Sequence, residues 1–450
     1  MNAIMAITGV FLLLTCEGYL LTSMILQTRR DIVLRMCLGF PLGALLNALV
    51  AFVLTLGGIP LRFPGFALLH AIIVIILGVL FFRYSERAEP SEPKTHHVRI
   101  PRWLLVLCIL LIAIISTVSI VTALTIPSFY WDTFTNWAMR SRLSFEAGAF
   151  MMKDVVQPQY PILLHSLEML PMTVLGGWHD MVANATTLML SITGFSALFL
   201  LVRKIHGWRL ALLALTLLFI IPLVVMHLRQ GYADIHLATY LLLSGSAFTI
   251  ASRLKDARWI ALSAILVAAA SWTKIEGAYT GILPWLCIAL FHIPVKRRKT
   301  FFLLLLTLTL IVIPWPLFVL LHGLPFSPHA SSVELHLDAL PLMLQHLFAM
   351  GMFGVHWWVI VLLLTLLCIR TPKMLQKLPT LSPILAWGIL STLFFILTYL
   401  FTSEVRGLIQ GDNFARAMLP PTMLLTLGLT LLLPACVRAP SGTSSEAAPM

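Results

Sequence analysis

Residues 103–126 read WLLVLCILLIAIISTVSIVTALTI, a run of apolar and small polar residues without a single charge. About 20 such residues form a helix long enough to cross a hydrocarbon core of about 30 Å, so this stretch predicts a membrane span. Similar stretches lie on both sides of it, at residues 4–26, 34–57, 65–82, 181–202, 209–228, 236–252, 259–273, 278–293, 300–321, 355–369, 383–402 and 417–436. Inside a bilayer each span must satisfy its own backbone groups, as an α-helix does. The sequence therefore predicts an all-α polytopic membrane protein with about thirteen transmembrane helices.

The composition of the 450 residues agrees with this class. Hydrophobic residues make up 59% of the chain and charged residues only 11%, against roughly 25% charged residues in an average soluble domain. A chain this apolar cannot cover a soluble core with polar surface. Secreted, cytosolic and disordered proteins are therefore excluded.

The net charge of +12 reports topology rather than a nucleic-acid partner. Nucleic-acid binders cluster Lys and Arg on a soluble face, whereas most of the 30 Lys and Arg here lie in short runs within alternate loops. By the positive-inside rule these loops face the cytoplasm, which places the N-terminus outside and the C-terminus inside. Most of the 18 Asp and Glu lie in the opposite loops, where we expect the polar chemistry. The short chain favours the bacterial cytoplasmic membrane.

The longest predicted external segment covers residues 127–180 and begins with SFYWD at 128–132. Apolar residues then recur at a helical spacing with low net hydrophobicity, which is typical of an amphipathic helix lying in the membrane interface. Asp132 begins this unit, where the fourth span leaves the membrane. A carboxylate at that boundary can be partly desolvated and act as a general base. Alternatively, Asp132 caps a helix or is a solvated loop acid.

Three further polar clusters lie in the same set of loops. RQGYADIH at 229–236 places Asp234 at the start of a span, where the helix dipole also favours an acid. WTKIEG at 272–277 places Lys274 beside Glu276; the two charges can simply pair, although ionisable residues near the membrane are functional candidates. The segment 404–416 ends in Arg416, which either extends its charge to the interface or binds a lipid phosphate.

Five short motifs follow one another along the chain: Trp131-Asp132, Trp137 with Arg140, Tyr160-Pro161, Gly231-Tyr-Ala-Asp234 and Thr273-Lys-Ile-Glu-Gly277. Together they resemble the GT-C superfamily of glycosyltransferases. The chain is most similar to glycosyltransferase family 39, which includes protein mannosyltransferases and aminoarabinose transferases, over residues 104–280, with a weaker match at 404–420. The resemblance implies a GT-C-like core that transfers a sugar with inversion from a polyprenyl-phosphate donor to an acceptor hydroxyl. The transfer would take place on the non-cytoplasmic face, with Asp132 as the base.

The chain departs from that family in two respects. Three spans precede the acid-bearing loop, which in the family usually follows the first span. Residues 1–103 are therefore a predicted N-terminal three-span unit, followed by a catalytic core at 104–436 and a disordered cytoplasmic tail at 437–450. The paired acids of the family are reduced to Asp132, which puts a metal requirement in doubt. If a divalent cation is the cofactor, Asp132 and Asp234 are its candidate ligands; otherwise Asp234 orients the acceptor.

Sugar transfer needs a base for the acceptor hydroxyl and cations that offset the charge growing on the departing phosphate. Asp132 is the predicted catalytic base, and the candidate cations are Lys274, Arg229, Arg406 and Arg416. Trp131, Tyr160 and Tyr232 either line a sugar or prenyl groove or belong to the aromatic belt of the membrane interface. The predicted donor-binding residues are Trp131, Arg140, Tyr160, Arg229, Tyr232, Asp234, Lys274, Glu276, Arg406 and Arg416.

The predicted partners are a polyprenyl-phosphate sugar lipid and membrane lipids, with no nucleic acid. Two other classes stay open. A secondary transporter or lipid-linked-glycan flippase would need ionisable residues near mid-membrane and related halves built around broken helices. A GT-C-type polymerase or ligase would carry its large external loop late in the chain, whereas here it comes early.

Overall fold

The computed structural model describes residues 2–27, 31–84, 99–128, 130–153, 155–293, 298–324, 333–370, 382–409, 411 and 413–437. The regular secondary structure of these residues is helical, apart from an isolated antiparallel bridge between Val333 and Thr402. The predicted tail at 437–450 lies outside the described residues apart from Val437. The elements, in chain order, are α1 (Ala3–Leu26), α2 (Ile32–Leu56), α3 (Phe63–Tyr84), α4 (Arg102–Thr125), η1 (Thr133–Ala138), α5 (Met139–Ala147), α6 (Leu163–Leu175), α7 (Asp180–His206), α8 (Trp208–Phe219), α9 (Pro222–Gln230), α10 (Ala233–Leu254), α11 (Ala257–Thr273), η2 (Ala278–Ile282), α12 (Leu283–His292), α13 (Arg298–Val312), α14 (Pro314–Leu321), α15 (Ala339–Gln345), η4 (His346–Met350), α16 (His356–Arg370), α19 (Pro383–Phe401), α20 (Val405–Ile409), α21 (Phe414–Ala417) and α22 (Leu419–Val437).

Each of the thirteen predicted spans falls on helix. Within the described ranges, nine helical stretches are long and apolar enough to cross a membrane. The sixth predicted span is a bent pair instead of one rod, because α8 and α9 meet at 79°. The break falls at Pro222, whose ring cannot follow a helical turn without loss of a hydrogen bond. The remaining three predicted spans are the shorter helices α11, η2 with α12, and α16.

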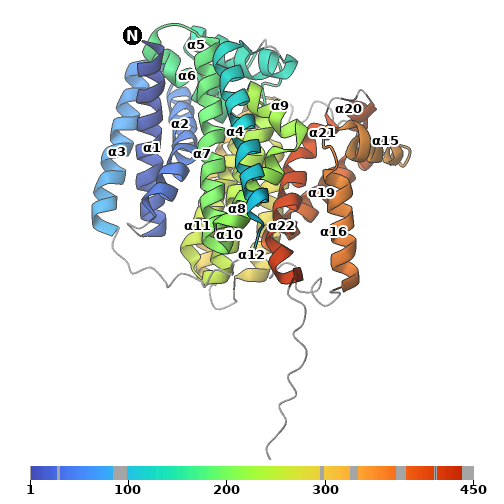
Figure 1. The fold of residues 1–450 in the computed structure, drawn as a ribbon. Helices are drawn as coiled ribbons and strands as arrows, with labels where there is room; N and C mark the ends of the chain where they lie inside the picture. Colours follow the sequence, from blue (N-terminus) through green and yellow to red (C-terminus); the bar gives the residue numbers. More distant parts are fainter. Residues whose placement is uncertain are drawn as a thin grey trace, which may run out of the picture.

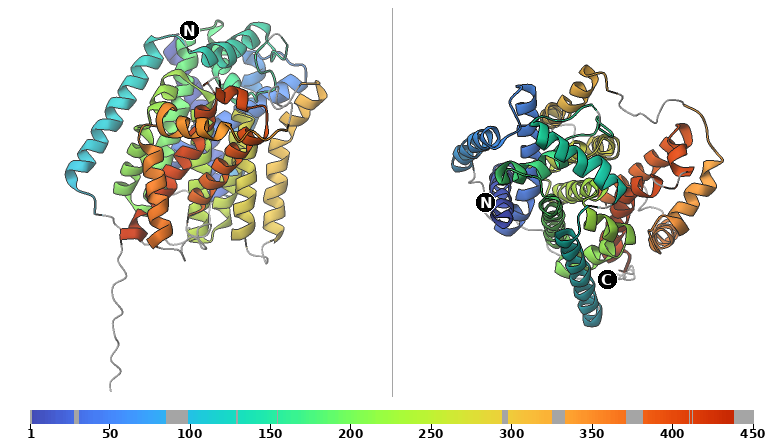
Figure 2. Two further views of the ribbon diagram at one scale, coloured as in Figure 1. Left: turned by 90° about the vertical axis from the view of Figure 1, so that its right-hand side faces the viewer. Right: turned by 90° about the horizontal axis from the view of Figure 1, so that it is seen from above.

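The helices form one bundle whose two ends differ. Helices α5 and α6 of the long loop, together with α9, α15, α20 and α21, gather at the end that carries the N-terminus (Figure 1). The last residue of α22, Val437, lies at the opposite end of the bundle (Figure 1). Helix α4 runs along the outside of the bundle (Figure 2), with an outward face of exposed apolar residues that suits contact with lipid.

Helices α1 and α2 pack closely because glycines remove side chains from their contact. A Cβ atom added at Gly18 would clash with the backbone of Gly39, and one added at Gly43 would clash with the backbone of Leu14. Close approach through small residues spaced four apart is a common way for membrane helices to associate. Glu17, buried inside this unit, accepts a hydrogen bond of 2.8 Å from Nδ1 of His70 in α3.

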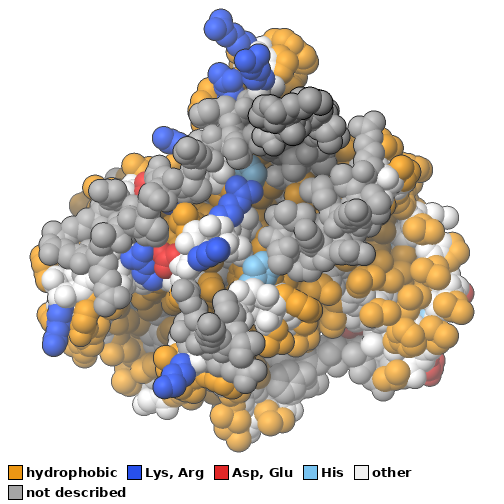
Figure 3. All heavy atoms as spheres, turned by 90° about the horizontal axis from the view of Figure 1, so that it is seen from below, with side chains coloured by type: hydrophobic (Ala, Val, Ile, Leu, Met, Phe, Trp, Pro, Cys, Tyr) orange, Lys and Arg blue, Asp and Glu red, His pale blue; other side chains and the backbone are white. Residues whose placement is uncertain are grey.

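The face opposite the long loop carries Lys and Arg side chains among apolar ones (Figure 3). Lys204, Arg209, Arg253 and Arg258 all lie in the first or last turns of helices that meet this face. This basic face is the one that the positive-inside rule assigns to the cytoplasm from the sequence.

Candidate active site

The π-helical turn η1 follows α4 in the chain, and Asp132 stands immediately before η1. Its side chain makes no capping hydrogen bond to the helix. It accepts a hydrogen bond of 3.1 Å from Nδ2 of Asn136, one helical turn further on. Asp132 therefore does not cap this helix, and its second oxygen, Oδ2, is left for partners other than Asn136.

Asp234 lies in the first turn of α10 and is only 1% exposed. The preceding turn ends α9 at Gly231, which has a φ of 64°, and a Cβ atom there would meet the Thr187 side chain. Glycine is required at that position for both reasons. The tight turn returns the chain into the bundle and buries the Asp234 carboxylate, so that this charge must find cationic partners.

Lys274 is the first of these partners. It follows the last residue of α11 in an extended conformation, which directs its ammonium group away from the helix. Nζ donates a hydrogen bond of 2.8 Å to Oδ1 of Asp234 and lies 3.0 Å from Oε1 of Glu276. It also lies 5.7 Å from the centre of the Tyr160 ring, within range of a cation–π contact.

Arg416, in the short helix α21, is the second partner and joins the two predicted acids. Its Nε and Nη2 lie 3.2 and 3.1 Å from Oδ2 of Asp234. The same Nη2 lies 2.5 Å from Oδ2 of Asp132. The guanidinium carbon stands 4.9 Å from the centre of the Tyr232 ring, which in turn stacks on His227. Arg416 is thus held between two carboxylates and an aromatic face.

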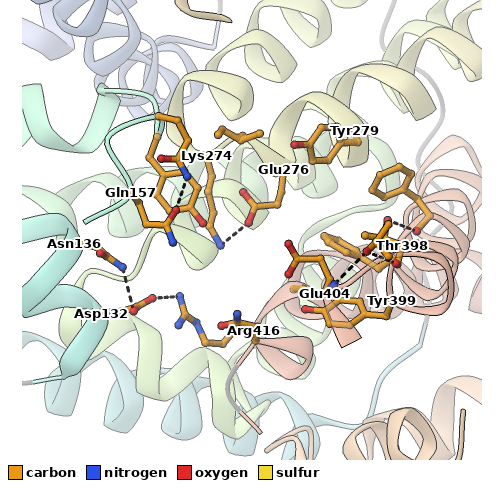
Figure 4. Close-up of a pocket in the computed structure, with 18 residues that line it drawn as sticks. Asp132, Asn136, Gln157, Lys274, Glu276, Tyr279, Thr398, Tyr399, Glu404 and Arg416 are labelled. Atoms are coloured by element: carbon orange, nitrogen blue, oxygen red, sulfur yellow. Dashed lines mark hydrogen bonds and ion pairs between the residues drawn. The ribbon is translucent and has the colours of Figure 1, made fainter. Parts of the chain in front are cut away.

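These charges surround a cavity of about 370 Å³ (Figure 4). Of the predicted site residues, Asp132, Tyr160, Lys274, Glu276 and Arg416 line it. Asp234 and Tyr232 stand behind the cations and hold them in place. Four predicted segments, separated by up to 284 positions along the chain between Asp132 and Arg416, therefore meet at one place. Burial raises the pKa of the Tyr160 phenol above its ordinary value, so this hydroxyl stays protonated at neutral pH.

Three predicted donor-binding residues lie elsewhere. Trp131 is 78% exposed, as expected for a ring in the aromatic belt. Arg406 is exposed on α20, and Arg229 lies in α9. None of the three is among the described residues that line the cavity. The sequence places them near the site along the chain, but proximity along the chain does not make them part of the cavity lining.

Arg140 also lies outside the lining, and the structure gives it different partners. Its guanidinium is buried and donates hydrogen bonds to the carbonyl oxygens of Met151, Pro158 and Tyr160 at 3.2, 3.0 and 2.9 Å. Burial lowers its pKa to about 9, which leaves it charged at neutral pH. Arg140 holds together the loop that presents Tyr160 to the cavity.

Several lining residues were not predicted from the sequence. They are polar or aromatic side chains that complete the walls: Asn136, Gln157, Gln159, Tyr279, Phe394, Phe395, Tyr399, Glu404 and Asn413. The spacing of four between Asp132 and Asn136 in a helical segment was a usable signal. The aromatic wall from α19 had none, because an aromatic residue in an apolar span looks the same whether it faces lipid or a cavity.

A divalent cation between Asp132 and Asp234, one of the two alternatives left open by the sequence, does not fit the arrangement. The carboxylate oxygens of Asp132 and Asp234 that face the site are already paired with Arg416 and Lys274, whereas a divalent cation needs such oxygens as ligands. In the part of the chain that the structure describes, no three His, Cys, Asp or Glu side chains are grouped for metal binding. The fixed cations Lys274 and Arg416 occupy the place where the metal was considered.

Fold and site together define a polytopic helical membrane protein with a charged cavity at one end of the helix bundle. The chain matches no family model and no curated protein sequence. Its fold is similar to that of ArnT from Cupriavidus metallidurans, in crystal structures of the apo state (TM-score 0.51, 17% identity) and of the state bound to undecaprenyl phosphate (TM-score 0.50, 18% identity). The similarity covers 75% and 73% of this chain, and this chain spans 60% of the ArnT chain in both cases. The predicted fold class, an all-α polytopic membrane protein, is confirmed, and ArnT shares this fold.

Proposed function

We propose that the protein transfers a sugar from a polyprenyl-phosphate donor to an acceptor hydroxyl on the non-cytoplasmic face of the membrane, with inversion at the sugar carbon. One observation carries the proposal: a single cavity at the membrane surface combines the carboxylate of Asp132 with the cations Lys274 and Arg416. A base and two cations are the groups that such a transfer needs.

The residues would divide the reaction between them. Asp132 takes the proton of the acceptor hydroxyl while the hydroxyl oxygen attacks the anomeric carbon. The bond from that carbon to the phosphate oxygen breaks, and the polyprenyl phosphate leaves with the electron pair. Lys274 and Arg416 stabilise the negative charge that develops on the phosphate, and they are already oriented by Asp234, so little reorganisation is needed.

The contact between Arg416 and Asp132 would link donor binding to the availability of the base. While Arg416 pairs with Asp132, its guanidinium occupies the carboxylate oxygen that would take the acceptor proton. A donor phosphate would compete for the same guanidinium, which Asp234 keeps in place from behind. Donor binding would therefore free the Asp132 carboxylate to take the acceptor proton. The base would become available only when the donor is bound.

The apolar part of the cavity supports a lipid donor. Phe394, Phe395 and Tyr399 of α19 form one wall, which suits an isoprenoid chain whose phosphate lies at the polar end. One of the similar ArnT structures is bound to undecaprenyl phosphate. The location in the bacterial cytoplasmic membrane, with the N-terminus outside, is part of this proposal.

The proposal is tested by replacing Asp132. Wild type is placed in proteoliposomes with a panel of undecaprenyl-phosphate-linked hexoses and pentoses and a bacterial membrane extract as the source of acceptors, and the release of undecaprenyl phosphate is measured. We expect Asp132→Asn to lower release by at least about 100-fold, the size of a general-base contribution. Asp180→Asn is the control, because Asp180 is a carboxylate on the same face that pairs with Trp178 outside the cavity.

Two results would contradict the proposal in different ways. Unchanged release from Asp132→Asn would remove the base. Movement of the donor lipid across the bilayer by wild type, without loss of the sugar, would favour a flippase instead.

A further inference from the structure

Four aromatic side chains form a buried cluster next to the cavity. Phe52, near the end of α2, stands at the centre, with its ring centroid 5.4 Å from that of Trp272, 6.2 Å from that of Trp315 and 5.5 Å from that of Phe318. All three contacts are edge-on, which is a favoured geometry for aromatic rings. None of the four residues lines the cavity, yet the cluster touches two of its walls.

The first connection leads to Lys274. Trp272 lies two residues before Lys274, in the last turn of α11. Its indole Nε1 donates a hydrogen bond of 2.7 Å to the carbonyl oxygen of Ile311 in α13. With one face against Phe52 and its nitrogen bonded to α13, the Trp272 ring fixes the end of α11, and the backbone of Lys274 continues directly from that end.

The second connection leads to Tyr160. Indole Nε1 of Trp315 donates a hydrogen bond of 2.9 Å to the carbonyl oxygen of Gln159, which lines the cavity. The next residue, Tyr160, places its ring 5.7 Å from Nζ of Lys274. The Trp315 ring therefore fixes the position of the Gln159–Tyr160 segment, whose Tyr160 ring contacts the Lys274 side chain.

Phe52 is the one member of the cluster that comes from the first three spans, and it contacts both indole rings. We propose that Phe52 is a positioning residue for the phosphate-binding cation Lys274, acting through Trp272 on its backbone and through Trp315 on the Gln159–Tyr160 wall. The N-terminal helix α2 is thereby part of the site. Helix α2 is also joined to α10, because the Tyr240 hydroxyl donates a hydrogen bond of 2.7 Å to the carbonyl oxygen of Pro41. The inference rests on the proposed function, because it assumes that Lys274 binds the donor phosphate.

The experiment measures preference for phosphate, which a purely structural role would leave unchanged. Full-length protein in nanodiscs is titrated with undecaprenyl phosphate and, separately, with undecaprenol, and the ratio of the two dissociation constants is taken. The preference for phosphate is the dissociation constant of undecaprenol divided by that of undecaprenyl phosphate. We expect Phe52→Leu to lower this ratio on the order of 10-fold, which corresponds to the loss of one charge-assisted hydrogen bond to the phosphate. Phe40→Leu is the matched control, since Phe40 is equally buried on the same helix but packs against Phe11 of α1. It should keep the wild-type ratio within about twofold.

A second pair of variants tests the route through the wall, with the same loss of ring volume in the variant and in its control. Trp315→Phe keeps an aromatic ring but removes the donor to Gln159, and we expect the same loss of phosphate preference. Its control is Trp285→Phe, which removes a buried indole hydrogen bond to Ser263 away from the site.

The outcomes separate the inference from the proposed function. If wild type binds both lipids equally, the phosphate site itself is absent and the proposed function fails. If wild type prefers the phosphate, and Phe52→Leu and Trp315→Phe keep that preference as their controls do, the positioning role alone is overturned. A lowered ratio in both variants, with melting temperatures matching those of the controls, supports it.

Discussion

Replacing Asp234 by Asn tests the charge arrangement at the centre of the site. Asp234 is 1% exposed and receives hydrogen bonds from Lys274 and from Arg416. Asparagine has nearly the same shape but no charge, so the substitution leaves both cations in place and removes the anion between them. We expect the substitution to lower the free energy of unfolding, whether or not the protein binds a donor lipid.

The size of the loss follows from the partners that remain. Removing one partner of a buried ion pair costs about 3–5 kcal/mol, because the other charge stays buried without compensation. Here Lys274 retains Glu276 at 3.0 Å, and Arg416 retains Asp132. Each cation therefore keeps one carboxylate, and we expect a loss near the lower limit, about 3 kcal/mol in the free energy of unfolding.

The assay is equilibrium unfolding in mixed detergent micelles, combined with a double-mutant cycle. Lys274→Met removes the opposite charge, and the double variant Asp234→Asn with Lys274→Met restores the charge balance of the pair. We expect the double variant to be less destabilised than the sum of the single variants, with a coupling energy of about 1–3 kcal/mol. Glu276 tolerates the loss of Lys274 because it is partly exposed.

Either of two results would refute the reasoning. A loss below about 0.5 kcal/mol for Asp234→Asn would mean that water or another group already compensates the cations. Additive effects in the cycle would mean that Asp234 and Lys274 do not interact in the folded protein.

Two further predictions concern the external loop. Burial raises the pKa of Glu168 in α6 from 4.5 to about 7, so between these pH values the folded protein holds a proton that the unfolded chain has lost. Stability should therefore fall as the pH rises from about 4.5 to about 7, by at most roughly 3 kcal/mol, and a series of melting curves should show this slope in wild type and a flatter profile in Glu168→Gln. Arg140→Met should remove the donor from the partly buried carbonyl oxygens of Met151, Pro158 and Tyr160, at a cost of up to about 1–3 kcal/mol each. Limited proteolysis should then cleave this segment faster than in wild type, whereas the exposed Arg142→Met, which loses only its pair with Glu146, should be cleaved at the wild-type rate.

The sequence predicted the helices well because a membrane span carries a strong local signal. About 20 apolar residues in a row can satisfy their backbone only as a helix, and each of the thirteen stretches is helical. The bend between α8 and α9 was missed, although Pro222 marks its position. A proline inside an apolar run is compatible with a kink, a break or a straight span, and the neighbours that decide between them are distant in sequence.

Some residues of the candidate site were predicted from the sequence because they are charged and lie at the ends of apolar spans. Asp132, Asp234, Lys274 and Arg416 stood out because a charge at the end of an apolar span is costly unless it has a partner or a function. The same reasoning also selected Arg140, Arg229 and Arg406, because proximity to a span end does not specify the direction of a side chain. Arg140 turned inward to backbone carbonyls, and Arg406 turned to the surface.

The sequence by itself determined that this protein is a bundle of membrane helices, and it indicated on which face its acids gather, because hydrophobic length and charge bias are local properties. Only the tertiary structure decided which charges meet. Asp234 and Arg416 are 182 positions apart, and Asp234 and Lys274 are 40 apart, so their pairing depends on how whole helices pack. It also decided that Phe52, an ordinary apolar residue in α2, lies against both tryptophans that support the cavity. Helix packing is set by the fit of many side chains at once, and no single stretch of the chain contains that information.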